Sequence, residues 1–173
     1  MRLGAFGSHL TYCSNIHPGE TWAEVRANIE RFFPAVRDRV VPGQPFGIGL
    51  RLSAQASRAL TDPATLEEFR DFLQRNKLYV FTINGFPYGT FHGTRVKEEV
   101  YLPDWRDAER LRYTDELADL LAKLVPAGVE GSVSTVPGAF KPAMTGNNGA
   151  DVERIADNLL RHVRYQLDAW YGS

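Results

Sequence analysis

The sequence predicts a parallel α/β fold built from four successive βα units, half the number in a (βα)8 TIM barrel. Four times along the 173 residues, a short β-rich run is followed by a loop containing Gly or Pro and then by an amphipathic helix. This alternation is typical of a parallel sheet. The four units use residues 1–173 as one domain, whereas a closed barrel takes about 250 residues. The predicted fold is therefore half of a barrel.

A small doubly wound α/β sheet is the alternative fold, and a chain of this length would complete it without a partner. A phosphate-binding G-x-G-x-x-G sequence commonly follows the first strand of such sheets. Here the first strand instead continues into NIHPGE, residues 15–20. The missing motif argues against the doubly wound sheet, whereas the chain length is compatible with it.

Composition and charge exclude several classes of protein. The chain is 43% hydrophobic and 24% charged, as a packed core requires. Its net charge of -1 and its lack of a long Lys/Arg block argue against a nucleic-acid partner. No apolar run approaches the roughly 18 residues of a membrane span. With one cysteine, Cys13, and no visible secretory signal, the expected location is the cytoplasm.

The first unit has the clearest local signals. We expect its strand over HLTYCSNI, residues 9–16. The helix should begin after Thr21, because TWAE matches a capping box in which Thr21 and Glu24 each bind a backbone N–H group. Pro34 is expected to kink or shorten this helix.

The second and third units contain the strands FGIGLRL, residues 46–52, and LYVFTIN, residues 78–84. Their helices are expected near 65–75 and 106–125. A long loop, residues 85–105, separates the third strand from its helix, and loops of that length in compact domains are usually functional or disordered. The aromatic residues in this loop argue against disorder.

The fourth unit combines the strand EGSVSTV, residues 130–136, with a last helix over 151–170. An arc of four parallel strands would leave two unpaired edges and an apolar inner face, and both features favour pairing with another chain. We therefore expect self-association, or association with a second half-barrel segment.

Candidate binding residues follow the strands, because ligands of parallel βα folds meet the loops at the carboxyl ends of the strands. After the third strand, Asn84 offers an amide, and Phe86 and Tyr88 could line an apolar wall of a small-molecule pocket. The alternative is that these aromatic rings only pack the loop onto the barrel rim.

His17 and Glu20 follow the first strand, and His92 lies in the long loop. A histidine in such a position can ligate a metal or transfer a proton. The alternative for His17 is a structural role, in which its ring caps the next helix or binds a backbone carbonyl. One histidine and one carboxylate are too few for a metal site, which needs three or four ligands.

Two cations complete the candidate substrate-binding residues. Arg51 ends the second strand after an apolar run, where it should meet an anion or form a structural ion pair. Lys141, in PGAFKP after the fourth strand, could contact a phosphate or carboxylate, or could simply be solvated.

Five stretches of the chain together resemble the EboE-type metabolite traffic proteins, which belong to the xylose isomerase-like TIM barrels of the sugar phosphate isomerase/epimerase group. The stretches are SNIHPGETW (14–22), FGIGLRLS (46–53), YVFTINGFPYGTFHG (79–93), VYLPDWRD (100–107) and EGSVSTVPGAFKP (130–142). Members of that family are about twice as long. The later strands of those proteins, which end in acidic residues, have no counterpart here, so the resemblance implies the N-terminal half of such a barrel.

The resemblance implies a protein that handles a small metabolite at the mouth of a TIM barrel. It also implies metal-assisted, isomerase-like or epimerase-like chemistry, in which His17 and His92 would share a divalent metal ion with carboxylates from a second half. The other hypotheses are a non-catalytic carrier module and a truncated fragment without activity. Family resemblance at the level of the fold does not establish a reaction.

Overall fold

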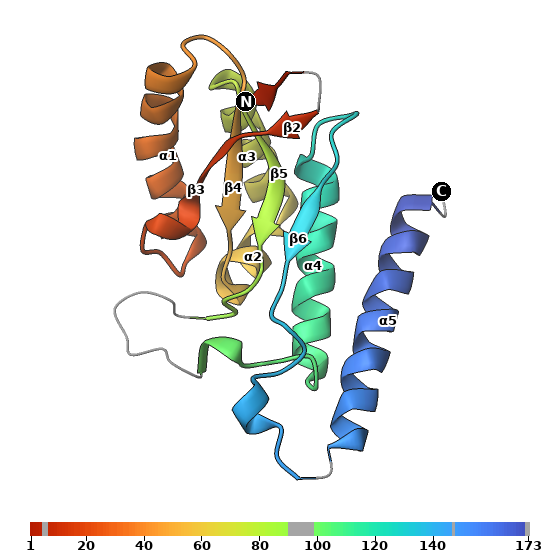
Figure 1. Cartoon of the computed structure of the whole chain (residues 1–173). Helices are drawn as coiled ribbons and strands as arrows, with labels where there is room; N and C mark the ends of the chain where they lie inside the picture. Colours follow the sequence, from red (N-terminus) through yellow and green to blue (C-terminus); the bar gives the residue numbers. More distant parts are fainter. Residues whose placement is uncertain (5–6, 90–98, 147, 172–173) are drawn as a thin grey trace.

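The protein has an α/β fold with a four-stranded parallel sheet. The computed structural model describes residues 1–4, 7–89, 99–146 and 148–171. The sheet has the order β3-β4-β5-β6, and each neighbouring pair is parallel (Figure 1). Its strands are β3 (Thr11–Cys13), β4 (Phe46–Arg51), β5 (Leu78–Asn84) and β6 (Ser132–Ser134). Strand order in space therefore follows strand order in the sequence.

A short antiparallel hairpin precedes the sheet. It consists of β1 (Arg2–Leu3) and β2 (Ser8–His9). The expected first strand over 9–16 is therefore divided, because His9 pairs with Arg2 and the segment Ser14–Ile16 forms the 3-10 helix η1. Only Thr11–Cys13 joins the parallel sheet. The expected strand over 130–136 is likewise shortened, to Ser132–Ser134.

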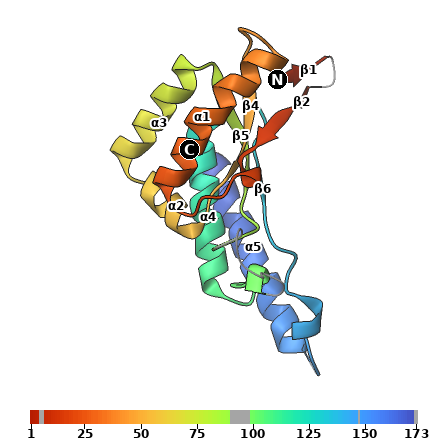
Figure 2. The same ribbon diagram turned by 90° about the vertical axis from the view of Figure 1, so that its left-hand side faces the viewer.

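The helices form one layer on one side of the sheet. α1 to α4 pack against each other behind the strands, and α5 lies alongside α4 (Figures 1 and 2). Among the residues described, none of the helices combines the length and apolar character needed to cross a bilayer. The helices are α1 (Trp22–Val40), α2 (Ala54–Leu60), α3 (Pro63–Arg75), α4 (Ala108–Leu124) and α5 (Gly149–Tyr171), with the 3-10 helices η2 (Glu99–Tyr101) and η3 (Lys141–Ala143) in the loops.

The capping box at the start of α1 is confirmed. The Thr21 hydroxyl accepts a hydrogen bond from the Glu24 N–H group, and the Glu24 carboxylate accepts from the Thr21 N–H group at 2.9 Å. The prediction that Pro34 would shorten the helix is wrong, since α1 continues to Val40. Phe33, beside the proline, is fully buried in the core. Tertiary packing there offsets the missing backbone hydrogen bond.

The hydrophobic core lies between the sheet and the helix layer. Phe46, Ile48 and Leu50 alternate along β4 and are at most 2% exposed. They join one apolar cluster with buried residues of α1, α3 and α4, such as Ile29 and Leu117. Alternate residues of a strand point to opposite faces, so this face of the sheet is the one that the helices cover.

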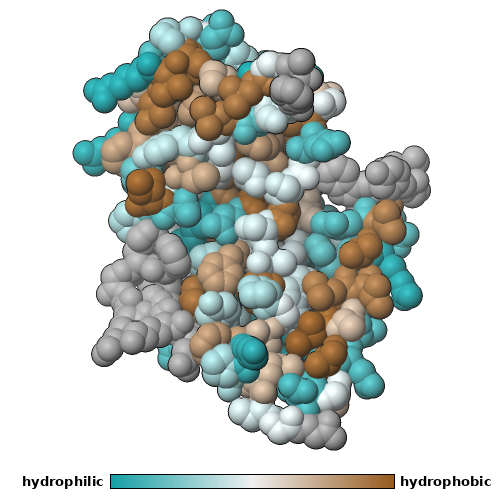
Figure 3. Space-filling view, in the orientation of Figure 1, coloured by the Kyte–Doolittle hydropathy of each residue, from teal (hydrophilic) through white to brown (hydrophobic). Residues whose placement is uncertain are grey.

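The opposite face of the sheet, here called the open face, is largely polar. Reading the register across the strands, most of its residues are small or carry hydroxyl, thiol or amide groups, and no described helix covers them (Figure 2). Two aromatic residues of β5 also lie there, since Tyr79 pairs with Gly47 and the Phe81 ring lies against Gly47. Figure 3 shows near-neutral hydropathy in the middle of the view, over these strands. The expected apolar inner face is therefore restricted to the region of Tyr79 and Phe81, and the rest of the face is polar. The open-face residues are Thr11, Cys13, Gly47, Gly49, Tyr79, Phe81, Thr82, Asn84, Ser132 and Ser134.

Candidate functional site

Arg51 and Glu20 lie together at the carboxyl ends of the strands. The sequence analysis placed each residue at this end of the sheet. Arg51 is 2% exposed, and its Nη1 and Nη2 atoms donate to Glu20 Oε1 at 3.1 Å and Oε2 at 2.9 Å. The same guanidinium donates to the carbonyl oxygens of Gly19 and Gly89, both at 2.7 Å. This is the structural ion pair that was the alternative for Arg51. It fastens the loops after β3 and β5 to the end of β4.

Ser53 and Ser14 extend these contacts of Arg51 and Glu20, which together are here called the clamp. The Ser53 hydroxyl donates to the Glu20 carbonyl and also caps α2 by accepting from the Ala56 N–H group. The Arg51 backbone N–H donates to the Ser14 hydroxyl at 2.7 Å. Both serines are buried. The four polar residues therefore form a rigid base for the loops at this end of the sheet.

His17 is held against α1. Its Nε2 atom lies 2.9 Å from the Tyr12 hydroxyl, and its ring stacks on Phe32 with centroids 4.0 Å apart and an interplanar angle of 3°. The ring thus packs on the helix layer, and neither of these two contacts is the helix cap or the carbonyl hydrogen bond of the expected structural alternative. The part of the chain that the structure describes contains no group of three or more His, Cys, Asp or Glu residues arranged to hold a metal. His92 lies outside the described residues, so the expected pair of His17 with His92 is not placed.

Asn84 is the predicted site residue that lies on the open face. Its Oδ1 atom accepts from the Phe86 N–H group at 3.0 Å and from the Ser134 hydroxyl at 3.2 Å. One step along the same strands, Ser132 donates to the Thr82 hydroxyl at 2.9 Å. Two cross-strand polar pairs therefore run side by side on β5 and β6, with Ser132 and Ser134 exposed to solvent.

Phe86 and Tyr88 leave β5 in different directions. The Phe86 ring meets Tyr101 edge-on with centroids 5.5 Å apart, and Tyr101 stacks on Phe140 at 4.9 Å. These rings form an aromatic group beyond the ends of β5 and β6. Such a group fits either the expected apolar wall or rim packing.

Tyr88 packs against the helix layer. Its hydroxyl donates to Glu109 and lies 3.0 Å from Arg58, while its ring meets Tyr113 at 5.2 Å. Burial, followed by the hydrogen bond to Glu109, raises the pKa of Tyr88. The contacts of Tyr88 are therefore with α2 and α4, and the expected pocket lining is not seen at this residue.

A second buried arginine, which the sequence analysis did not single out, anchors the segment after β5. Arg110 is fully buried, and its guanidinium donates to the carbonyl oxygens of Pro103 at 2.7 Å, Gly85 at 2.7 Å and Phe86 at 3.3 Å. Burial lowers the pKa of this guanidinium. Backbone carbonyl oxygens thus accept hydrogen bonds from the charged Arg110 side chain of α4. These bonds hold the segment after β5 against the helix layer.

Lys141 and the remaining open-face residues complete the comparison with the sequence. Lys141 is exposed on η3, as expected of a solvated lysine.

The sequence analysis missed Thr82 and Ser132 as parts of a candidate surface. A signal was present, because Gly47 and Gly49 alternate with Ile48 and Leu50 in FGIGLRL. Such alternation indicates that the two faces of the strand have different environments.

Comparison of the chain with models of protein families, with curated proteins and with solved structures gives no match.

Proposed function

We propose that this chain is a metabolite-handling protein of the EboE type that binds a small polar metabolite on the open face. One observation carries the proposal. Parallel sheets are found almost only with both faces covered, yet here one face carries hydroxyl and amide groups and no described helix. A polar face on a parallel sheet is suited to a polar ligand enclosed by further protein.

The architecture that we propose is the N-terminal half of a TIM barrel. Two features support it: the strands follow one another in sequence order, and the helices lie on one side. A doubly wound sheet reverses its strand order and places helices on both sides. In the proposed half barrel, the open face is part of the inner wall, and a second copy of the chain supplies the remaining strands.

The chemistry of the open face favours a ligand rich in hydroxyl groups. Asn84 and the hydroxyls of Thr82, Ser132 and Ser134 offer both donors and acceptors. Such groups can exchange their cross-strand partners for ligand hydroxyls. The two glycines of β4 leave room at the centre of the face for neighbouring side chains, because a Cβ atom at Gly47 would lie 2.7 Å from Phe81 Cε1 and one at Gly49 would lie 2.7 Å from Cys13 Sγ. We therefore propose a sugar or a sugar phosphate as the ligand class.

Binding without catalysis is the form of the function that the contacts favour. The acid and the base nearest the mouth, Glu20 and His17, are engaged with Arg51, Tyr12 and Phe32. Metal-assisted isomerase or epimerase chemistry remains a proposal that rests on the family resemblance.

Cys13 provides a direct test, because it is the single cysteine of the chain and lies exposed on the open face. The rate of Cys13 alkylation by iodoacetamide would be measured with and without D-xylose or D-ribose 5-phosphate, and binding would be measured by isothermal titration calorimetry. We expect one of these sugars to bind and to slow the alkylation. Asn84→Ala should weaken binding, whereas Gln55→Ala, an exposed change on α2, should not.

Two outcomes would overturn the proposal. In the first, neither sugar binds at millimolar concentration. In the second, a sugar binds but leaves both the alkylation of Cys13 and the effect of Asn84→Ala unchanged, so that the ligand lies elsewhere.

A further inference from the structure

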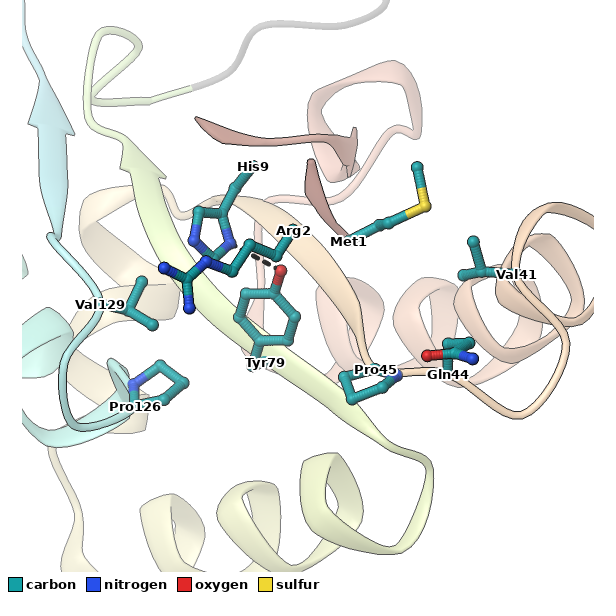
Figure 4. A pocket seen from close by; sticks show the side chains of 9 residues that line it. All are labelled: Met1, Arg2, His9, Val41, Gln44, Pro45, Tyr79, Pro126 and Val129. Atoms are coloured by element: carbon teal, nitrogen blue, oxygen red, sulfur yellow. Dashed lines mark hydrogen bonds between the residues drawn. The ribbon is translucent and has the colours of Figure 1, made fainter. Parts of the chain in front are cut away.

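A second pocket lies at the opposite end of the sheet, beside the amino end of β5. It has a volume of about 570 Å³ (Figure 4). Val41, Pro45, Pro126 and Val129 supply apolar walls. Ligand pockets commonly have about 300–1,000 Å³ and apolar linings with a few polar groups. The size and the lining of this pocket therefore suit a small organic molecule.

The polar groups of the pocket come from the hairpin and from β5. His9 Nδ1 lies 2.8 Å from the Tyr79 hydroxyl, and the His9 ring meets the rings of Tyr79 and Phe81 at 5.6 Å and 5.0 Å. Burial, followed by the positive charges of the amino terminus and Arg2, lowers the pKa of His9. Burial raises the pKa of Tyr79. Both rings are therefore neutral near pH 7.

Arg2 is the charged side chain of this pocket. Figure 4 shows its guanidinium among His9, Tyr79 and Val129, on the pocket side of the hairpin. None of the ion pairs formed among the described residues involves Arg2. Among the described residues that line the pocket, none carries a carboxylate. Glu130 lines a neighbouring pocket of about 430 Å³, which shares Arg2, His9 and Val129.

We propose that this pocket binds a small carboxylate with a flat apolar body. The guanidinium of Arg2 would pair with the carboxylate, as planar guanidinium groups do. The Tyr79 ring and the two prolines would contact the flat body. Tyr79 and Asn84 lie near opposite ends of β5, so the carboxylate site lies at the other end of the strand from Asn84, although the neighbouring pocket reaches Ser132 of the open face. Neither proposal depends on the other.

The test compares two probes of the same shape, 2-naphthoate and the uncharged 2-naphthamide. The chain would carry any purification tag at its carboxyl end, so that the hairpin is unaltered. Binding would be measured by calorimetry for the native chain, for Arg2→Gln and for Arg39→Gln, an exposed change in the last turn of α1. We expect naphthoate to bind more tightly than the amide. Arg2→Gln should weaken naphthoate by at least about tenfold, the usual scale of a charge-assisted hydrogen bond, and leave the amide unchanged.

A second variant tests the pocket independently, in case Arg2→Gln disrupts the hairpin. Val129→Trp should fill the pocket from the opposite wall and weaken both probes, while the melting temperature and the alkylation rate of Cys13 stay near the native values. Three results would overturn the inference: no binding of naphthoate at millimolar concentration, equal binding of the acid and the amide, or naphthoate binding that neither Arg2→Gln nor Val129→Trp alters.

Discussion

Gly85 shows how closely packing determines single residues at the end of β5. A Cβ atom added there would lie 2.5 Å from the Leu117 Cδ1 atom and 2.9 Å from the Ser134 carbonyl oxygen. The Asn-Gly pair at this point resembles a hairpin turn in the sequence. In the structure, the glycine instead allows α4 and β6 to approach the strand exit.

We therefore expect Gly85→Ala to lower the free energy of unfolding by about 1–3 kcal/mol, the usual cost of overpacking. Urea denaturation followed by circular dichroism measures this change. Gly89→Ala is the matched control, because a Cβ atom at Gly89 meets no atom within 4 Å. Equal unfolding midpoints for the two variants would contradict the packing account.

Arg51 shows what the sequence could and could not predict about the candidate site. A cation after an apolar run indicated a partner, and Glu20 is that partner. The carbonyl oxygens of Gly19 and Gly89 were not predictable, because they depend on the path of two loops. For the same reason, sequence analysis did not identify Arg110, whose partners are backbone atoms spread over the loop after β5.

Removing the charge of Glu20 should destabilise the fold. Glu20→Gln leaves the buried guanidinium of Arg51 without its counter-ion. Breaking a fully buried pair costs about 3–5 kcal/mol. The Glu20 side chain is 25% exposed, so we expect about 2 kcal/mol, reduced by solvent screening. Glu67→Gln breaks an exposed pair with Arg70 and should have little effect. Comparable losses in denaturant midpoint for both variants would argue against the clamp.

At the scale of elements, periodicity predicted the two long strands and most helices well. β5 matches residues 78–84 fully, and β4 ends one residue earlier than expected. The helix α2 was missed because it is short and has a small-residue sequence, AQASRAL, with a weak apolar stripe. Its start depends on the Ser53 cap. The ends of the first strand were misjudged because His9 belongs to the hairpin and the β-branched Ile16 belongs to η1.

The start of α1 should depend on pH through Glu24. Backbone N–H groups of Thr21 and Glu20 donate to its carboxylate and lower its pKa below the ordinary value of 4.5. A group with a lowered folded pKa stabilises the fold above its unfolded pKa, and this stabilisation is lost as the pH falls through the folded pKa.

We expect Glu24→Gln to be less stable than the native chain near pH 6.5 and to approach it at acidic pH, below the folded pKa. Chemical denaturation across this range measures the difference. Glu68→Gln, an exposed change on α3, should give a flat difference. A Glu24→Gln difference that does not vary with pH would show that the carboxylate charge has no role in the cap.

At the scale of the whole molecule, the proposed self-association would use the edges of the sheet and α5. Within the described residues, β3 and β6 each pair on one side only. Near β6, α5 exposes a stripe of apolar side chains, visible as brown atoms in Figure 3. A pocket of about 240 Å³ lies between α4, β6 and α5. The stripe comprises Val152, Leu160, Val163 and Leu167, each about half exposed (49–55%).

A second copy could be related to the first by a two-fold axis along the strands. Strand β3 of the second copy would then pair with β6 of the first, and the second copy would cover this stripe. The strands of both copies would then run in the same direction, as in a closed parallel barrel. Near β3, Leu10 and Ile16 are 46% and 65% exposed, so apolar surface is present on both sides of the proposed seam.

Charges placed on the stripe should separate the copies without unfolding them. We expect the double change Leu160→Glu and Leu167→Glu to halve the solution mass and to keep the helical circular dichroism spectrum. Arg154→Glu, an exposed change on the same helix, should keep the native mass. A native mass in the double variant would place the contact elsewhere.

The mass of the native chain in solution tests the central claim, that the open face is the inner wall of a barrel completed by a second copy. Size-exclusion chromatography with light scattering measures it directly. The account predicts a single peak at twice the 19.4 kDa of one chain. A monodisperse peak at 19.4 kDa over the whole concentration range would contradict it.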